Sequence, residues 1–213
     1  MVKVFNYSNS IDFSANTYVI GKVNDDCIIV DLGSNDKAIF DYVSSHHSKC
    51  LAILLTHGHF DHIKGLDPFL KKCKYDIPVY LNKEDKPLLL DPYLNCSTTM
   101  GYQVKCNTTI NEITDDCEIK IGSHNIKVIY TPFHTKGSVC YLFEDENALF
   151  TGDTLFKDSI GRTDLPSSKP SLIDYSLKKL INLNEWLVVY PGHGDISTLH
   201  VEKENNPFLK DLK

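Results

Sequence analysis

The segment THGHFDH at residues 56–62 decides the fold, and it directly follows the apolar run LAILL at residues 51–55. It places three imidazoles and one carboxylate within six residues. His57 and His59 are two positions apart, so in an α-helix their side chains would point about 200° from one another. We therefore expect an extended loop there. Asp61 and His62 are adjacent and point in different directions, so one segment can serve two metal ions.

Three later positions can complete such a site. His134 ends TPFH at residues 131–134, Asp153 ends FTGD at residues 150–153, and His193 lies in YPGHG at residues 190–194. Each follows a predicted strand, and loops at strand ends are where a rigid sheet presents its chemistry. A single histidine or a single Thr-Gly-Asp is weak evidence, because both occur commonly at surfaces and turns. Together with the first segment they indicate a metal centre.

The rest of the chain reads as strands that alternate with amphipathic helices. In the first half we expect strands at residues 2–5, 17–20, 27–31, 50–55 and 78–81, a helix at 35–44, helical pieces on both sides of 78–81, and an irregular connection at 91–112. In the second half we expect four closely spaced strands at residues 118–121, 125–130, 139–143 and 148–151, then a helix at 171–183 and a strand at 187–190. The close spacing favours a mostly antiparallel second sheet.

No Pro-rich or Gly-rich linker divides the chain, so we expect one domain over residues 1–213, with two sheets face to face and helices outside. The 213 residues are 42% hydrophobic and 23% charged, which is typical of a packed domain. The longest apolar runs fall short of the roughly 18 residues that cross a membrane. The first 20 residues lack the continuous apolar core of a secretion signal. We therefore expect a cytoplasmic protein, a monomer or homodimer, with no membrane partner.

Charge and cysteine usage exclude further classes. The net charge of −6 and the scattered lysines argue against a nucleic-acid partner. The seven cysteines include no C-x-x-C pair, so neither a disulfide framework nor a Cys-only zinc site is indicated.

The pattern H-x-H-x-D-H, followed by His134, Asp153 and His193, resembles the metallo-β-lactamase-fold hydrolases over almost the whole chain. The resemblance implies an α/β (α+β) fold, the four-layered αββα sandwich. It also implies a ligand set that is carried over position by position. One ion is held by His57, His59 and His134, the other is held by Asp61, His62 and His193, and Asp153 bridges both. Asp31, at the end of IIVD, resembles the early aspartate that supports the ligands in this family.

Imidazole and carboxylate ligands favour zinc, with iron or manganese as alternatives. Two such ions would share a water and lower its pKa toward 7, which supplies a bridging hydroxide as nucleophile. Asp61 would orient that hydroxide and take its proton. The expected reaction is hydrolysis, without a serine or cysteine nucleophile.

The stretches FTGDTLF at residues 150–156 and IGRTDLP at residues 160–166 resemble the short glyoxalase-II-like (hydroxyacylglutathione hydrolase-like) subfamily. The resemblance implies a small-molecule thioester substrate, S-D-lactoylglutathione or a related hydroxyacyl thioester. Arg162, the one arginine in the chain, either binds the substrate carboxylate or pairs with Asp158 or Asp164. Only 20 residues follow His193, so we expect no separate C-terminal helical glutathione-binding domain.

Three questions stay open at this point. A persulfide dioxygenase with one iron on His57, His134 and Asp153 is the alternative enzyme, because it has a similar Gly-Arg-Thr-Asp stretch. A lactonase is disfavoured, since Phe156 lacks the tyrosine hydroxyl that such enzymes carry there.

Three aromatic residues near the ligands either line the pocket or pack in the core: Phe133, Tyr141 and Phe156. Four histidines match no ligand position and are expected at the surface: His46, His47, His124 and His200.

Overall fold

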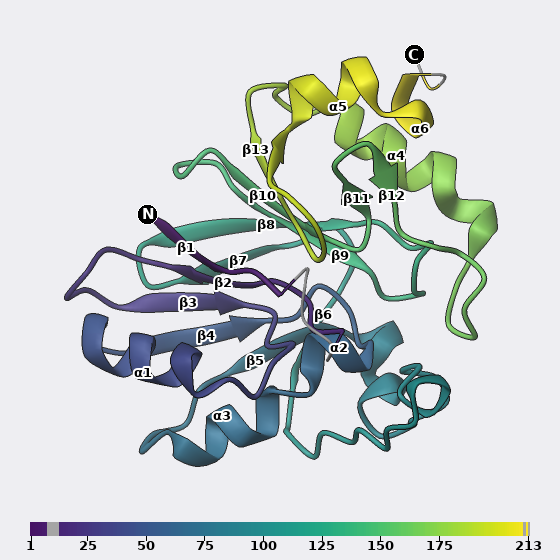
Figure 1. The fold of residues 1–213 in the computed structure, drawn as a ribbon. Coiled ribbons are helices and arrows are strands. Elements are labelled where there is room, and N and C mark those ends of the chain that lie inside the picture. The colour runs from purple at the N-terminus through teal and green to yellow at the C-terminus, as the bar shows by residue number, and fades with distance from the viewer. Residues whose placement is uncertain (8–12, 211, 213) are drawn as a thin grey trace.

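The computed structural model describes residues 1–7, 13–210 and 212. At its centre two six-stranded sheets face each other (Figure 1). The first sheet has the order β1 (Val2–Phe5), β2 (Thr17–Ile20), β3 (Cys27–Val30), β4 (Cys50–Leu54), β5 (Val79–Asn82), β6 (Asn111–Ile113). The second has the order β14 (Ser197–Thr198), β13 (Val188–Pro191), β10 (Ala148–Gly152), β9 (Val139–Phe143), β8 (His124–Tyr130), β7 (Glu118–Ile121). A small ribbon pairs β11 (Leu155–Phe156) with β12 (Ser159–Ile160).

Strand direction differs between the two sheets. In the first sheet β3, β4, β5 and β6 run parallel, whereas β1, β2 and β3 are antiparallel neighbours. In the second sheet the neighbours are antiparallel except β10 and β13, which are parallel. The expected mostly antiparallel second sheet is therefore confirmed. Parallel neighbours matter for the site, because their carboxyl ends lie at the same edge of a sheet.

Helices form the two outer layers (Figure 1). The α-helices are α1 (Lys37–His46), α2 (Phe60–Ile63), α3 (Leu66–Lys72), α4 (Ile173–Ile181), α5 (Leu199–Asn205) and α6 (Pro207–Lys210). The 3-10 helices are η1 (Lys83–Leu89), η2 (Thr98–Met100) and η3 (Pro170–Leu172). Helix α1 begins where the Asp36 carboxylate accepts a hydrogen bond from the Ala38 amide at 2.8 Å. Its Ile39 and Val43, one turn apart, are buried against the first sheet.

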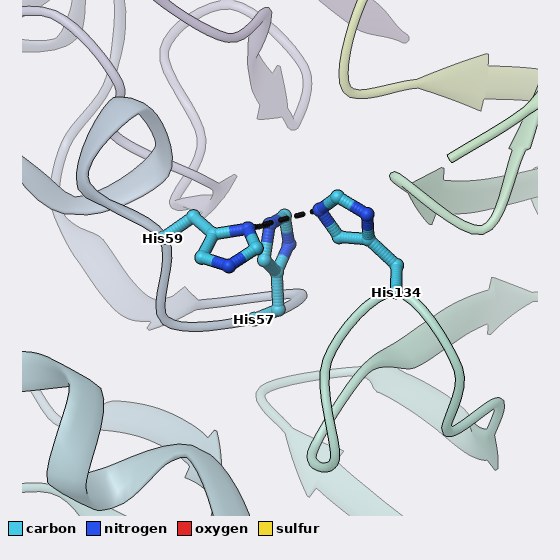
Figure 2. Close-up of side chains that lie close together, drawn as sticks. All are labelled: His57, His59 and His134. Atoms are coloured by element: carbon cyan, nitrogen blue, oxygen red, sulfur yellow. Dashed lines mark hydrogen bonds between the residues drawn. The ribbon is translucent and has the colours of Figure 1, made fainter. Parts of the chain in front are cut away.

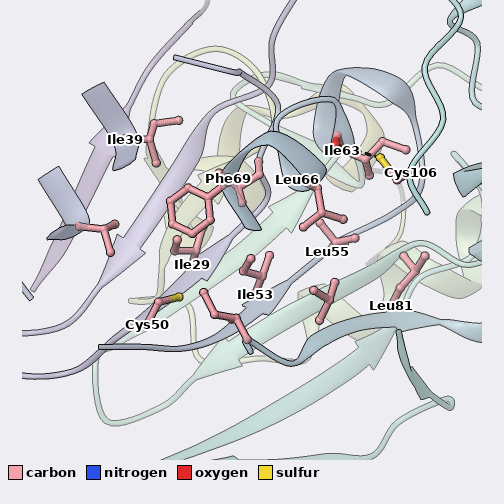
Figure 3. Close-up of a cluster of buried hydrophobic side chains, with 14 of the residues drawn as sticks. Ile29, Ile39, Cys50, Ile53, Leu55, Ile63, Leu66, Phe69, Leu81 and Cys106 are labelled. Carbon is pink, nitrogen blue, oxygen red and sulfur yellow. Dashed lines mark hydrogen bonds between the residues drawn. The ribbon is translucent and has the colours of Figure 1, made fainter. Parts of the chain in front are cut away.

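Strand β4 shows how the layers are joined. Its side chains alternate between two cores, as a pleated strand requires. Ile53 packs with Ile39 and Phe69 between the first sheet and its helices (Figure 3). Leu54 belongs to the core between the sheets, together with Tyr141 of β9. A third core lies between the second sheet and helices α4 and α5. These three cores separate four layers, so the expected αββα sandwich is confirmed.

Two parts of the structure differ from the sequence prediction. Helix α2 begins directly after His59, so the extended loop covers His57–Gly58–His59 while Asp61 and His62 lie on a short helix. The connection expected to be irregular contains η2 and β6, which pairs with β5. Short elements such as these carry too little periodicity to be read from the sequence. Among the described residues, every helix is too short or too polar to span a membrane.

Candidate functional site

The site lies at one edge of the sandwich, where strands from both sheets end. Asp31 directly follows β3, and the segment from His57 to His62 follows β4. From the second sheet, His134 follows β8, Asp153 follows β10 and His193 follows β13. The structure therefore brings all the sequence-predicted candidates for the metal centre to one place. Their role as ligands remains a prediction.

Three imidazoles converge in the first half of the site (Figure 2). His57 Nε2 lies 3.1 Å from His59 Nδ1, and His59 Nδ1 lies 2.9 Å from His134 Nε2. All three side chains are buried. Two of the rings come from the loop after β4 and the third comes from the opposite sheet. Their convergence therefore depends on how the two sheets are packed.

The second half of the site contains Asp61, His62 and His193. Their nearest ligand atoms lie within 4.8 Å of one another. His193 Nε2 lies 3.0 Å from Asp61 Oδ2, and His62 is fully buried behind them. The two predicted groups of three are thus both assembled.

Asp153 lies between the two halves. Its Oδ2 is 3.3 Å from His134 Nε2, in the first half. Its Oδ1 is 3.2 Å from His62 Nε2 and 3.8 Å from His193 Nε2, in the second half. One carboxylate oxygen therefore faces each group, as a bridging ligand requires.

Hydrogen bonds behind the rings fix which ring nitrogen faces the site. Thr56 Oγ1 donates to Asp31 Oδ2 at 2.8 Å, so it can accept a hydrogen bond from His57 Nδ1, 3.1 Å away. His62 Nδ1 donates to the same Asp31 oxygen at 2.8 Å. Because each Nδ1 donates away from the site, the Nε2 atoms of His57 and His62 point into it. Asp31 thus supports one imidazole in each half.

The other two imidazoles of the first half also have partners outside the site. His134 Nδ1 donates to the backbone carbonyl of Arg162 at 2.8 Å, which leaves its Nε2 lone pair free to bind. His59 Nε2 lies 2.9 Å from Ser167 Oγ. Sequence reasoning missed both partners, since a backbone carbonyl and a single serine carry no signal in the sequence.

The charges of the buried groups follow from burial and from their neighbours. Burial, reinforced by the neighbouring imidazoles, lowers the pKa of His59 to about 3 and that of His57 well below its ordinary value. Burial opposes protonation of His62 and His193 too, but nearby carboxylates outweigh it and raise the pKa of both. Burial disfavours the Asp153 carboxylate, yet the surrounding imidazoles hold its pKa well below the ordinary value. Metals bind neutral imidazoles and ionised carboxylates, so an ion bound here would displace protons from His62 and His193.

Three observations test whether these residues fit metal ions. First, His62 Nε2 and Asp153 Oδ1 are buried and lie 3.2 Å apart without a well-aligned hydrogen bond, so both atoms can bind a cation between them. Second, His57 Nε2 and His134 Nε2 lie 3.1 and 2.9 Å from the same atom, His59 Nδ1, which carries at most one proton, and a cation would satisfy all three nitrogens. Third, a Cβ on Gly192 would lie 2.3 Å from Asp153 Oδ1, so the cradle admits no side chain there. The residues fit two divalent cations.

A cleft of about 580 Å³ opens over the site. Its floor includes His59, Asp61, His134, Asp153 and His193. Its walls are largely apolar and include Phe13, Phe60, Met100, Phe156, Ile160 and Leu165. The cleft is therefore polar at its floor and largely apolar along its walls.

The open question about the three aromatic residues is answered differently for each position. Phe156 lines the cleft. Phe133 and Tyr141 are fully buried in the cores, so they do not line it. The Tyr141 hydroxyl donates to the Leu55 carbonyl at 2.8 Å, which explains how its polar end tolerates burial.

Arg162 lies at the cleft, and its side chain is paired with Asp164. Nε and Nη2 donate to the two carboxylate oxygens at 2.7 and 2.8 Å. This is the ion pair that the sequence allowed, and no contact with Asp158 is involved. The Arg162 side chain is 65% exposed, so a substrate carboxylate can still reach it.

Comparisons with known proteins agree with this architecture. The Metallo-beta-lactamase superfamily model matches residues 11–193. The chain is 39% identical to the probable metallo-hydrolase YqgX of Bacillus subtilis over 92% of each chain. It is 28% identical to the hydroxyacylglutathione hydrolase GloC of Haemophilus influenzae, over 92% of this chain and 93% of GloC.

Two crystal structures are similar over nearly the full chain. BLEG-1 B3 metallo-beta-lactamase is 35% identical with a TM-score of 0.90, over 98% of this chain and 99% of that chain. TTHA1623 in a di-iron-bound form is 31% identical with a TM-score of 0.80, over 97% of this chain and 100% of that chain. With its fold, its clustered His and Asp residues and its matched family model, the chain belongs to the metallo-beta-lactamase superfamily.

Proposed function

We propose that this protein is a dinuclear metal-dependent hydrolase of small hydroxyacyl thioesters, S-D-lactoylglutathione or a related compound. The observation that carries the proposal is the position of Asp153, whose two oxygens face two groups of three candidate ligands. Asp153 also forms a third group with His57 and His62, one residue from each of those two groups. His57, His59 and His134 would hold one ion, and Asp61, His62 and His193 would hold the other.

Zinc suits this donor set, and iron is the alternative, since TTHA1623 was crystallised in a di-iron-bound form. When bound, the ions would supply Lewis acidity that polarises a carbonyl and makes water acidic enough to attack it. The protein itself supplies the positions of the ligands, through Asp31, Thr56 and the Arg162 carbonyl.

Asp61 is the residue that we propose to orient the attacking water and to accept its proton. Burial alone would raise its pKa, but the hydrogen bond from His193 and the charge of His62 hold that pKa below its ordinary value. Asp61 is therefore a carboxylate at neutral pH, and it lies on the floor of the cleft. A carboxylate in that position can receive a proton from a water held next to it.

The cleft and the similarity to GloC support a thioester as the substrate. Its apolar walls fit the uncharged acyl and thioester portion, while Arg162 at its edge fits a carboxylate on the thiol carrier. Hydrolysis rates for a panel of thioesters that differ in acyl group and in thiol carrier would identify the preferred substrate.

The test is metal content combined with two assays on the same preparation. We expect about two metal ions per chain, hydrolysis of S-D-lactoylglutathione or another hydroxyacyl thioester, and no O₂ uptake with glutathione persulfide. One iron per chain together with O₂ uptake would instead establish the persulfide dioxygenase.

A variant of the bridging residue sharpens the test. Asp153→Ala should lower the affinity for both ions and reduce kcat/KM by more than about 100-fold, because both groups share that carboxylate. Asp145→Ala is the matched control, since Asp145 is exposed in the turn between β9 and β10. Full activity in Asp153→Ala would refute the dinuclear site.

A further inference from the structure

Asp85 is a fully buried carboxylate that belongs to neither group of proposed ligands. It lies in η1, which directly follows β5 of the first sheet. Thr135, in the loop of the second sheet that carries His134, is 50 positions further along the sequence. Sequence reasoning passed over it, because the surrounding LNKEDKPLL resembles any polar helical turn. Burial of an aspartate without a cation beside it is unusual, so its partners need an explanation.

Those partners lie in two loops that carry the first group of imidazoles. Asp85 Oδ2 accepts from the Gly58 amide at 2.9 Å, and Gly58 stands between His57 and His59. The same oxygen accepts from Thr135 Oγ1 at 2.7 Å, and Thr135 directly follows His134. One carboxylate oxygen thus touches both loops.

The other oxygen strengthens the attachment to the second loop. Asp85 Oδ1 accepts from the Gly137 amide at 2.7 Å. A Cβ on Gly137 would lie 2.7 Å from Asp85 Cγ, so only glycine lets the loop approach this closely. A Cβ on Gly58 would meet the Leu88 side chain of η1 at 2.7 Å, so the first loop is seated equally tightly.

We propose that Asp85 is a positioning residue for the metal centre: its carboxylate joins the His57–Gly58–His59 loop of the first sheet to the loop of residues 134–137 of the second. This inference rests on the proposed function, because it concerns the ion that His57, His59 and His134 would hold. His59 Nδ1 lies within about 3 Å of the nitrogens of both His57 and His134, although His134 comes from the opposite sheet, so the two loops must be held in register.

The Asp85→Asn variant removes one of the two acceptor oxygens and leaves the size of the side chain unchanged. An amide has one acceptor oxygen, and its nitrogen only donates. In either orientation that nitrogen faces a donor, the Gly137 amide in one case and the Gly58 amide with Thr135 in the other. With the nitrogen at the Oδ1 position, the oxygen still accepts from Gly58 and Thr135, and only the Gly137 attachment is lost; with the nitrogen at the Oδ2 position, the Gly58 amide is released. In both cases the variant weakens the attachment of one loop while it keeps the volume of the buried side chain.

Asp67→Asn is the matched control. Asp67 also joins two segments, because it accepts from the Asn107 amide at 3.0 Å and from the Thr108 hydroxyl at 2.5 Å. Neither Asn107 nor Thr108 belongs to the metal centre. Asp67 is half-buried whereas Asp85 is fully buried, so this control shows what the loss of an attachment outside the metal centre does to metal binding, not the size of the stability loss.

The first measurement is metal affinity, by competition with a chelator, and the visible absorption of the Co(II)-substituted protein. In Asp85→Asn we expect roughly 10- to 100-fold weaker binding of one ion, an altered Co(II) spectrum and near-normal binding of the second ion. Asp67→Asn should keep both affinities and the spectrum. Unchanged affinity and spectrum in Asp85→Asn, with a lower unfolding temperature, would make Asp85 merely structural and overturn the proposal.

Thr135→Val provides a milder variant in case Asp85→Asn does not fold. It removes one donor to Asp85 and keeps a β-branched side chain of similar shape, so we expect a smaller loss at the same ion. An unchanged affinity there, with Asp85→Asn unfolded, would count against the proposal.

A second measurement does not depend on metal. In long-range ¹H–¹⁵N spectra of the metal-free protein, Asp85→Asn should shift the ring signals of His57, His59 and His134 while those of His124 and His200 stay in place. If the wild-type protein binds no ion, the proposed function fails, and this spectrum still decides whether Asp85 positions the rings. Unshifted ring signals would overturn the inference on its own terms.

Discussion

Asp31 contacts both halves of the metal centre although it is not among the proposed ligands. It accepts from the His62 ring directly and reaches the His57 ring through Thr56. Its backbone adopts the left-handed conformation, with φ of 56°, which turns the chain sharply at the end of β3. A single residue therefore couples the orientation of two rings. Its carboxylate is held by three hydrogen bonds, from the Thr56 amide, the Thr56 hydroxyl and His62 Nδ1.

At the residue scale, Arg162→Lys distinguishes the role of the backbone carbonyl at position 162 from the role of the guanidinium side chain. The lysine keeps the backbone carbonyl that accepts from His134, so metal content should be unchanged. It loses the planar fork that binds a carboxylate with two hydrogen bonds. Because the site is exposed, we expect KM for an anionic thioester to rise about threefold to fivefold, with kcat nearly constant.

Steady-state kinetics with an anionic and an uncharged thioester would check this, and metal analysis would serve as the control. The rise in KM should be confined to the anionic substrate. If the KM for each substrate were the same in the variant as in the wild type, Arg162 would have no role in substrate binding.

At the scale of single elements, β4 has two tasks. It fills two cores with alternate side chains, and it delivers the His57–His59 loop at its carboxyl end. Ile53→Ala should lower the free energy of unfolding by about 2 to 5 kcal/mol, because it empties space in a fully buried core.

Urea unfolding of metal-free protein would measure that loss. Leu90→Ala is the control, since Leu90 is 56% exposed, and it should change stability by less than about 0.5 kcal/mol. A loss below about 1 kcal/mol at Ile53 would mean that the core relaxes around the missing atoms.

At the scale of the whole molecule, the proposed ions would join the two sheets, because each group of ligands includes residues from both. Ions that bind only the folded chain stabilise it by mass action, by about 4 kcal/mol at a thousandfold excess over Kd. Removing them with a chelator should therefore lower Tm by about 10 °C.

Differential scanning fluorimetry with and without chelator would test this expectation. Asp153→Ala should already melt at the lower temperature and respond little to the chelator. Equal Tm values for the treated and untreated wild-type protein would contradict the expectation that bound ions join the two sheets and stabilise the fold.

The sequence predicted the sandwich, most of the strands and the residues that gather in the metal centre. Those predictions came from local patterns: period-two strands, amphipathic helices, and imidazole and carboxylate side chains next to strand ends. Helix α2 and strand β6 were missed, because four or three residues are too few to show a period. The sequence also did not predict which aromatic side chains line the cleft: Phe133 packs in a core, whereas Phe156 lines the cleft.

By itself, then, the sequence determined which side chains are candidates for binding metal, because residue type and strand-end position are properties of short segments. Only the tertiary structure decided what holds the ligands in place. Gly58 meets Asp85 from 27 positions away, and His59 meets Ser167 from 108 positions away. Such partners are buried hydrogen-bonding groups with no motif of their own, and they become visible only when two sheets are packed against each other.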